Sequence, residues 1–203
     1  MTRIGGALLI CGAIFCGCAR TQPDAPAAAP AVVSVAAPAV ESPADIKGIV
    51  LRNNAVSLLY ELVGNEKNVS KVLLIKHASA DLGRLIHGIS LTAGDIANRL
   101  DQMAAADPEL KLYALRLPAG EKATRDAIAK TEEHELLFSS GNNFQFQLLL
   151  TQADALSYGW HLAKMAADNS KQPAEIRAFT EMSGAMEDLY QQVVGMLKAT
   201  QNP

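Results

Sequence analysis

The sequence predicts an all-α protein, a four- to five-helix antiparallel bundle that follows a disordered tether. From Asp45 onward, apolar residues recur every three or four positions, which is the spacing of one face of a helix. Residues with high helix propensity dominate, aromatic residues make up only 5% of the chain, and no segment alternates convincingly with the period of a strand. The predicted limits are residues 1–17 and 18–44 for the leading segments and 45–203 for the helical domain.

The first predicted helix begins near Asp45 and ends at Gly64-Asn65, a pair that favours a left-handed cap. A longer apolar run then extends from Val72 to Met103 without a break in its three-four spacing. Such a run is typical of a bundle or coiled-coil helix. Because glycine costs a helix up to about 1 kcal/mol relative to alanine, the run is either one helix or two helices that separate near Gly88.

Three further helices are predicted in the second half of the chain. Pro118 suits the first turn of a helix that extends to about Phe138, and residues 139–143 form the clearest loop. The fourth helix is expected at 144–168 and the fifth from Pro173 to Leu197. The expected inward face of the fourth helix consists of Leu148, Gln152, Leu156, Gly159, Leu162 and Met165.

The first 17 residues have the composition of an export signal. Arg3 supplies a positive charge, and the apolar stretch Ile4–Phe15 is too short to span a hydrocarbon core of roughly 30 Å. The stretch ends in Phe15-Cys16-Gly17-Cys18, which resembles the lipobox of bacterial lipoproteins. This resemblance implies that Cys18 is lipidated and becomes the first residue of the mature chain. An ordinary secretory signal with incidental cysteines is the alternative.

The segment 19–44 is expected to be an extended spacer. It holds five of the nine prolines, which exclude a packed helix or a central strand. At about 3 Å per residue, a polyproline-like chain of this length reaches up to about 80 Å from a bilayer. Ala19 lacks the aspartate associated with retention in the inner membrane. We therefore expect a lipid-anchored protein of the bacterial cell envelope, on the periplasmic side of the outer membrane if the source is Gram-negative.

Charge and cysteine content narrow the function classes. Lys and Arg total 18 against 21 Asp and Glu, which argues against a sequence-independent grip on nucleic acid. All three cysteines precede the helical domain, so that domain has neither a disulfide nor a thiolate metal site. It also lacks a G-x-S-x-G elbow and a glycine-rich phosphate loop. The prediction is a protein without catalytic activity.

The four histidines do not have the spacing of a ferritin-type di-metal centre. Such centres use Glu-x-x-His motifs on two helices, and none of the histidines has a glutamate three residues before it. We therefore predict neither a metal site nor another cofactor.

Four residues remain as tentative ligand-binding positions. His134 lies in the densest polar cluster, Glu132–Glu135, whose consecutive side chains point about 100° apart and converge only with help from another helix. His161 adjoins Trp160, with Tyr158 nearby, and the three would form part of a ligand pocket. The alternative interpretations are a solvated helix face for His134 and an amphipathic pair at the edge of the core for Trp160 and His161.

The chain from Leu117 to Leu197 contains LP-x-x-EK, ELLFSSGNNF and LLLTQADALSYGWHLAKMA, followed by a break before Pro173 and a terminal amphipathic helix. In this layout it resembles an uncharacterised family of exported bacterial domains with a ferritin-like bundle. The resemblance implies a helical bundle. Members of that family tend to carry histidines in their long helices, and the corresponding positions are not evident in this chain.

These observations support two functional hypotheses. The first is a non-catalytic envelope lipoprotein whose bundle binds another envelope protein or forms a homodimer through an exposed apolar seam. The second is a ferritin-like protein that binds a metal or a small ligand. An apolar cavity bordered by Tyr158, Trp160 and His161 would favour the second, whereas a packed core with these side chains outside would favour the first.

Overall fold

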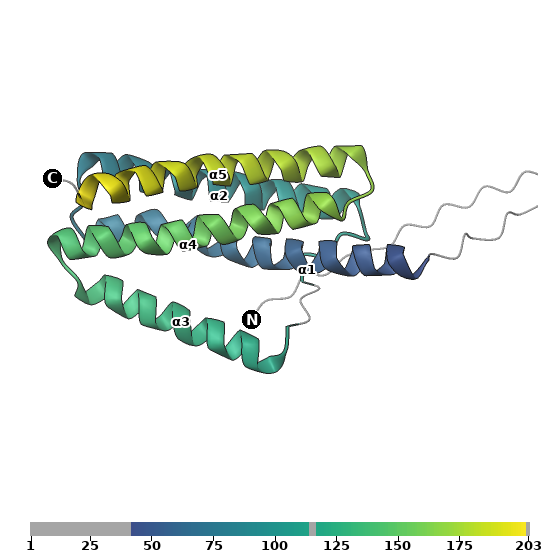
Figure 1. Cartoon of the computed structure of the whole chain (residues 1–203), viewed down its shortest axis with the longest axis horizontal. Coiled ribbons are helices and arrows are strands. Elements are labelled where there is room, and N and C mark those ends of the chain that lie inside the picture. Colours follow the sequence, from purple (N-terminus) through teal and green to yellow (C-terminus); the bar gives the residue numbers. More distant parts are fainter. Residues whose placement is uncertain (1–41, 114–116, 202–203) are drawn as a thin grey trace, which may run out of the picture. The chain divides into compact units, whose positions relative to one another are not determined.

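The computed structural model describes residues 42–113 and 117–201, and within these ranges it contains helices and no strand (Figure 1). The predicted all-α class is therefore confirmed. The elements are α1 (Pro43–Glu66), the 3-10 helix η1 (Val69–Leu74), α2 (Ala80–Ala106), α3 (Ala119–Phe138), α4 (Gly141–Asp168) and α5 (Pro173–Gln201).

Four of the helices form an antiparallel bundle, and the fifth lies outside it. α1 packs against α2 and α4, and α5 packs against the same two helices, so that the four close into a ring. Neighbouring helices in this ring run in opposite directions (Figure 1). α3 contacts the bundle along α4, and η1 packs against α2. The predicted four- to five-helix arrangement is thus a four-helix core with one peripheral helix.

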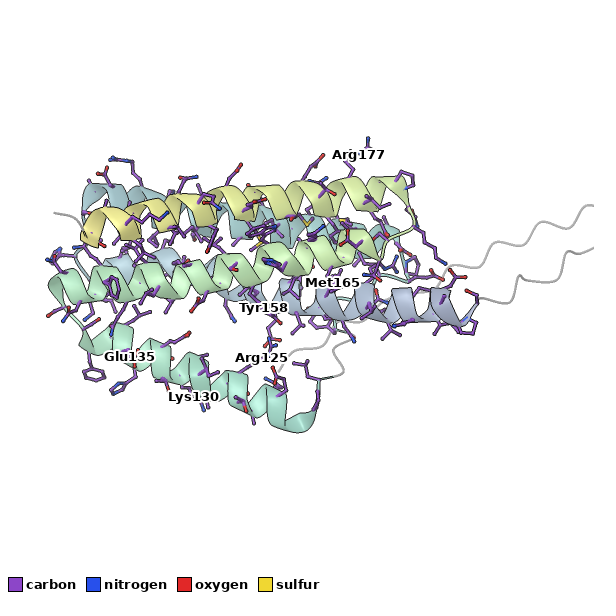
Figure 2. All side chains as sticks on the ribbon, in the orientation of Figure 1. Arg125, Lys130, Glu135, Tyr158, Met165 and Arg177 are labelled. Carbon is purple, nitrogen blue, oxygen red and sulfur yellow. The ribbon has the colours of Figure 1, made fainter. Side chains whose placement is uncertain are left out.

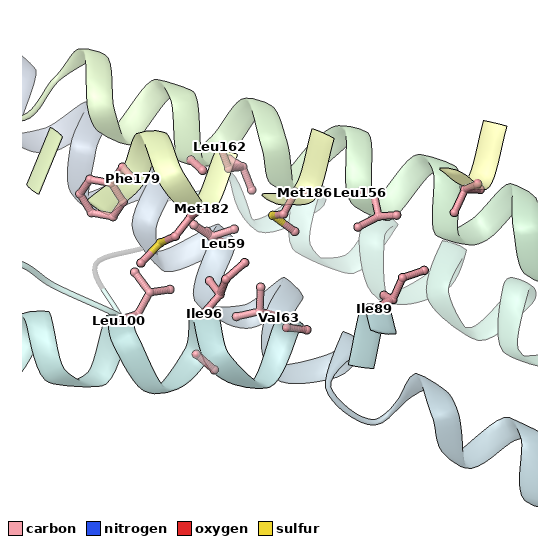
Figure 3. Close-up of a cluster of buried hydrophobic side chains, with 14 of the residues drawn as sticks. Leu59, Val63, Ile89, Ile96, Leu100, Leu156, Leu162, Phe179, Met182 and Met186 are labelled. Atoms are coloured by element: carbon pink, nitrogen blue, oxygen red, sulfur yellow. The ribbon is translucent and has the colours of Figure 1, made fainter. Parts of the chain in front are cut away.

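The core contains apolar side chains from all four bundle helices (Figure 3). Burial of each large aliphatic or aromatic side chain contributes roughly 1.5–3 kcal/mol, so this core supplies most of the driving force for folding. The predicted seam of the second apolar run lies inside this core. Its fully or almost fully buried members are Leu82, Ile86, Ile89, Ala93, Ile96 and Leu100.

The second apolar run breaks earlier than its spacing predicted. Val69–Leu74 is a 3-10 helix, Ile75 is 66% exposed, and α2 starts only at Ala80. Ser79, which fits the apolar seam by position, is the N-cap of α2 and accepts a hydrogen bond from the Leu82 amide at 3.3 Å. The capping hydroxyl sets the start of this helix, and Gly88 lies in its unbroken interior.

The loop between the third and fourth helices is shorter than predicted. Only Ser139 and Ser140 lie outside the helices, and α4 begins at Gly141. Gly141 has a φ of 57°, a conformation that glycine adopts without steric cost, and this permits the abrupt change of direction. Met165, assigned to the inward face of α4, is 45% exposed, whereas the other five assigned positions are buried.

The start of α1 lies inside the range assigned to the linker. The helix begins at Pro43, a residue that suits the first turn. Ser42 is its N-cap and forms a capping box with Asp45, because the Ser42 hydroxyl accepts from the Asp45 amide at 3.2 Å while the Asp45 carboxylate accepts from the Ser42 amide at 3.3 Å.

A buried ion pair joins α1 to the start of α5. The Arg52 guanidinium lies 3.0 Å from Glu175, and its distance to Asp107 is 3.8 Å. On the same helix, the Asn53 amide donates to the Glu109 carbonyl at 3.0 Å. These polar contacts hold the segment that follows α2 against α1. They lie away from the exposed outer side of α3.

Candidate functional site

α3 is the one long helix of the described chain that buries no residue fully. Its sequence is rich in Glu, Lys, Thr and Ala, and this composition offers no broad apolar stripe to the bundle. Arg125, Glu132 and Leu136 are its half-buried positions with a described side chain. They are spaced by seven and four residues, so they lie along one narrow face of the helix.

Polar contacts hold α3 near both of its ends. Near its beginning, the Arg125 guanidinium donates to the Tyr158 hydroxyl of α4 at 2.7 Å and lies 5.0 Å from the centre of the Tyr158 ring. Figure 2 shows these two side chains pointing toward each other. Near its end, the Lys76 ammonium donates to the carbonyls of Leu137 and Ser139 at 2.6 and 2.8 Å.

A cavity of about 870 Å³ lies between these attachments, and we call it the α3 cavity. Its lining comes from the end of α1, from η1, from α3 and from the middle of α4. This volume is within the range of about 300–1,000 Å³ that is typical of ligand sites. Its walls are largely apolar and include Leu62, Val69, Val72, Leu136, Leu148 and Ala155.

Two polar side chains in the lining have buried acceptor atoms without a partner. Gln152 of α4 is only 3% exposed, and its Oε1 atom has no hydrogen-bond partner among the described residues. The Oε2 atom of Glu66, at the end of α1, is likewise buried and unpaired. Buried polar atoms in folded proteins are nearly always hydrogen-bonded, so two such acceptors on one cavity distinguish it from a simple packing gap.

The lining carries a strongly negative charge. Its acidic side chains are Glu66 of α1, Glu132 and Glu133 of α3, and Asp154 of α4, whereas Lys71 of η1 is the basic side chain of the lining. Carboxylates from three helices therefore line one cavity, and the single ammonium group of Lys71 does not balance their negative charge.

Burial and mutual repulsion change the acidity of two of these carboxyl groups. Burial raises the pKa of Glu66 to about 7, and the charge of Glu132 raises it further. A hydrogen bond with the side chain of Gln152 lowers this pKa in part. The pKa of Glu132 is also raised, first by burial and then by Asp154 and Glu135. Glu66 is therefore poised to exchange a proton near neutral pH.

The acidic groups do not form a metal centre. Within residues 42–113 and 117–201, no group of three or more His, Cys, Asp or Glu side chains could hold a metal ion. The lining side chains also include no thiol and no histidine. The chemistry that the cavity offers is hydrogen-bond acceptance, negative charge and proton exchange at Glu66.

The four tentative ligand-binding residues do not come together. Tyr158 lines the α3 cavity, where it also contacts Arg125. His161 is exposed, with its Nδ1 atom 2.7 Å from the Ser157 carbonyl oxygen and its ring 4.5 Å from that of Trp160. His134 is exposed on α3 and contacts the Phe138 ring. His134, Trp160 and His161 are not part of the cavity lining.

Sequence reasoning did not single out Glu66. It assigned Gln152 to the inward face of the fourth helix and named it among the glutamines that could hydrogen-bond across helices or bind a partner, with a solvated surface position as the alternative. The predicted left-handed cap at Gly64-Asn65 placed Glu66 beyond the first helix. This prediction is wrong, because α1 includes Glu66 and its C-cap, Lys67, has a right-handed conformation. The signal that could have found the site is Gln152, a polar residue flanked on its own helix face by Leu148 and Leu156. A polar residue in an apolar stripe needs a partner or a ligand.

Cys18 and residues 1–17, assigned to lipidation and to an export signal, lie outside the described residues. None of the helices in the described part of the chain is long and apolar enough to cross a membrane. We found no protein family, no curated protein and no solved structure that matches this chain.

Proposed function

We propose that this chain is a lipid-anchored binding protein of the bacterial cell envelope, and that its helical domain takes up a small ligand in the α3 cavity. The observation that carries this proposal is a largely apolar cavity of about 870 Å³ that contains two buried, unpaired acceptor atoms, on Glu66 and Gln152. The proposed role is binding without catalysis.

The packing of α3 supports a ligand-binding role over a purely structural one. A cavity left in a protein destabilises it, in proportion to the contacts that its lining side chains lose. Closer packing of α3 on α4 would recover those contacts. The helix is instead attached by polar contacts of Arg125 and Lys76 near its two ends, and the cavity lies between these contacts.

The N-terminal sequence supports the lipid anchor. Arg3, the short apolar stretch and Phe15-Cys16-Gly17-Cys18 have the order expected of a lipoprotein signal, and the proline-rich residues 19–44 suit a spacer. Bacterial lipoproteins of this kind carry several acyl chains, which together anchor a protein far more firmly than one chain does.

The fold offers less support for the other hypotheses. Self-association through the seam of the second apolar run would need an exposed face, whereas Ile86, Ile89 and Leu100 of α2 are buried within their own chain. A metal-binding role would need converging ligands, and the described residues hold no such group. A small organic ligand is the occupant that suits a cavity with aliphatic walls and several polar side chains.

The test is to identify what the protein carries from cells. The full-length chain is purified from bacterial membranes, and small molecules released by denaturation are compared by mass spectrometry with those from an Ala155→Phe variant. Ala155 lines the cavity, so the added ring should fill it and remove the bound compound. Ala199→Phe, on an exposed position of α5, is the matched control and should retain it. Identical small-molecule content in all three proteins would contradict the proposal.

A further inference from the structure

We propose that the α3 cavity selects an organic cation, a protonated amine on an apolar body, with the ammonium group at Glu66 and Gln152 and the body against the aliphatic walls. This inference rests on the proposed function and names the class of ligand for the same site. Three features of the cavity lead to it: the type of its unpaired atoms, the sign of its charge and the nature of its walls.

The unpaired atoms call for a hydrogen-bond donor. Oε1 of Gln152 accepts hydrogen bonds only, and Oε2 of Glu66 does so when the carboxyl group is ionised. An ammonium group has three donors and no acceptor, so it can pair with both atoms at once. A carboxylate or phosphate ligand would place acceptors against acceptors. These two unpaired acceptor atoms therefore favour a cation over an anion.

The charge around these atoms favours the same choice. Glu132 and Glu133 face the cavity from α3 and Asp154 faces it from α4, against one cation, Lys71 of η1. In a space partly screened from water, attraction between a ligand cation and these carboxylates is stronger than in bulk solvent. Their mutual repulsion is relieved when a positive charge enters.

The walls favour an organic cation over an inorganic one. The acidic groups come from three different helices, and no three of them in the described chain are arranged to hold a metal ion. Between them lie Leu62, Val72 and Leu148, which an apolar body would cover. Removal of that body from water favours binding through the hydrophobic effect.

Binding of such a cation should release a proton. Glu66 faces Glu132 and Glu133 of α3, Asp154 of α4 and Lys71 of η1, and its pKa is raised to about 7. Below that pH the neutral carboxyl group loses its proton to the solvent as the ammonium group arrives, and the ion pair forms. Affinity should therefore rise with pH and level off above about 7.

The test uses three probes of the same shape: 1-adamantanamine, 1-adamantanol and 1-adamantanecarboxylate. Each is titrated calorimetrically into the full-length chain held in phosphatidylcholine nanodiscs, with empty nanodiscs as the blank. We expect the amine to bind at least about tenfold more tightly than the alcohol, and the carboxylate not to bind. For a pKa near 7, amine affinity should rise about 30-fold between pH 5.5 and pH 8. At pH 6, titrations in two buffers of different ionisation enthalpy should report about one proton released per amine.

Glu66→Gln is the decisive variant, and Glu61→Gln on the exposed side of the same helix is its matched control. Glu66→Gln should reduce amine affinity to that of the alcohol and abolish its pH dependence, while binding of the alcohol persists and shows that the cavity is intact. Glu61→Gln should behave like the unmodified chain.

The remaining outcomes separate this inference from the proposed function. Equal or tighter binding of the alcohol or the carboxylate would overturn the choice of a cation and leave the cavity as a ligand site. Binding of Ca²⁺ that depends on Glu66 and displaces the amine would overturn the organic ligand in favour of a metal ion. Failure of all three adamantane probes to bind would overturn the inference, and the small-molecule comparison with Ala155→Phe would then decide the proposed function independently.

Discussion

Glu66 links the cavity to the stability of the fold at the scale of one residue. Its pKa rises from 4.5 to about 7 because burial disfavours the charged form. A carboxyl group with a raised pKa in the folded state favours folding when protonated, so its contribution is fully present below pH 4.5 and is lost as pH rises through about 7. Between pH 5 and pH 8 this loss is between about 2 and 3 kcal/mol.

We therefore expect Glu66→Gln to stabilise the protein at high pH. The amide has nearly the shape of the carboxyl group and no charge, so the free energy of unfolding at pH 8 should increase by about 2–3 kcal/mol relative to the unmodified chain, with a much smaller gain at pH 5. Urea unfolding at both pH values measures this difference. If the gain were equal at the two pH values, the buried carboxyl group would not be its source.

Gly159 of α4 lies where side chains from α1 and α5 pack closely against it. A Cβ atom at this position of α4 would lie 2.8 Å from both Leu62 Cδ2 and Met186 Sδ, closer than packed atoms tolerate. Gly159→Ala should therefore destabilise the fold by about 1 kcal/mol, since overpacking of about 1–3 kcal/mol outweighs the gain in helix propensity.

The matched control for this substitution is Gly88→Ala in α2. A Cβ atom at Gly88 meets nothing within 4 Å, so only the gain in helix propensity applies and the stability should rise by about 0.5–1 kcal/mol. Chemical denaturation of both variants measures the contrast. A gain in stability from Gly159→Ala would show that the tips of Leu62 and Met186 move aside without cost.

At the scale of the element, α3 should open independently of the bundle. It buries no residue fully, whereas α4 and α2 each contribute many core side chains. Its opening should therefore cost far less than global unfolding. In native-state hydrogen exchange, the amides of α3 should exchange well before those of α2 and α4.

Tyr158→Phe tests what holds α3 in place. The substitution removes the hydroxyl that accepts from Arg125 at 2.7 Å and keeps the ring beneath the guanidinium. Loss of about 1 kcal/mol from this contact should speed exchange in α3 about fivefold and leave the other helices unchanged. Tyr190→Phe, on α5, is the control and should not affect α3. Equal exchange in α3 with and without the Tyr158 hydroxyl would show that the Lys76 contacts suffice.

Three of the bundle helices, α2, α4 and α5, could be predicted from the sequence because each has an apolar face of its own. The periodicity of residues 82–100 and of the fourth helix corresponds directly to buried side chains. The breaks were less predictable, since Ser79 fits both the seam and a cap, and Ser139–Asn143 has loop composition although Gly141 already starts a helix. In both cases a local hydrogen bond or backbone conformation decided the boundary.

The cavity could not be predicted because it depends on how α3 packs against α1, η1 and α4. Nothing in the sequence of α3 fixes its distance from α4, and Glu66, Glu132 and Asp154 are far apart along the chain. Clusters of polar and aromatic residues along the sequence led to the prediction of His134 and His161 as ligand-binding residues. Both are exposed, and each contacts an aromatic ring on its own helix. Residues that meet only through tertiary packing leave little trace in one sequence.

At the scale of the whole molecule, the fold separates stability from binding. The core of α1, α2, α4 and α5 carries the fully buried apolar side chains, whereas α3 covers the cavity and adds only the half-buried Leu136 at the edge of that core. Under the proposed function, we expect a ligand to displace α3 while the bundle stays folded.

The proposed lipid anchor at Cys18 can be tested by replacing one sulfur atom with oxygen. Replacement of the Cys18 thiol with a hydroxyl removes the nucleophile that would carry the lipid, so Cys18→Ser should move the protein from the membrane fraction to the soluble fraction of bacterial cells. Cys16→Ser changes the other cysteine of the same motif and should leave the protein in the membrane fraction. Fractionation with immunoblotting measures both. If Cys18→Ser stayed with the membrane, the anchor would lie elsewhere, and release by Cys16→Ser would move it to Cys16.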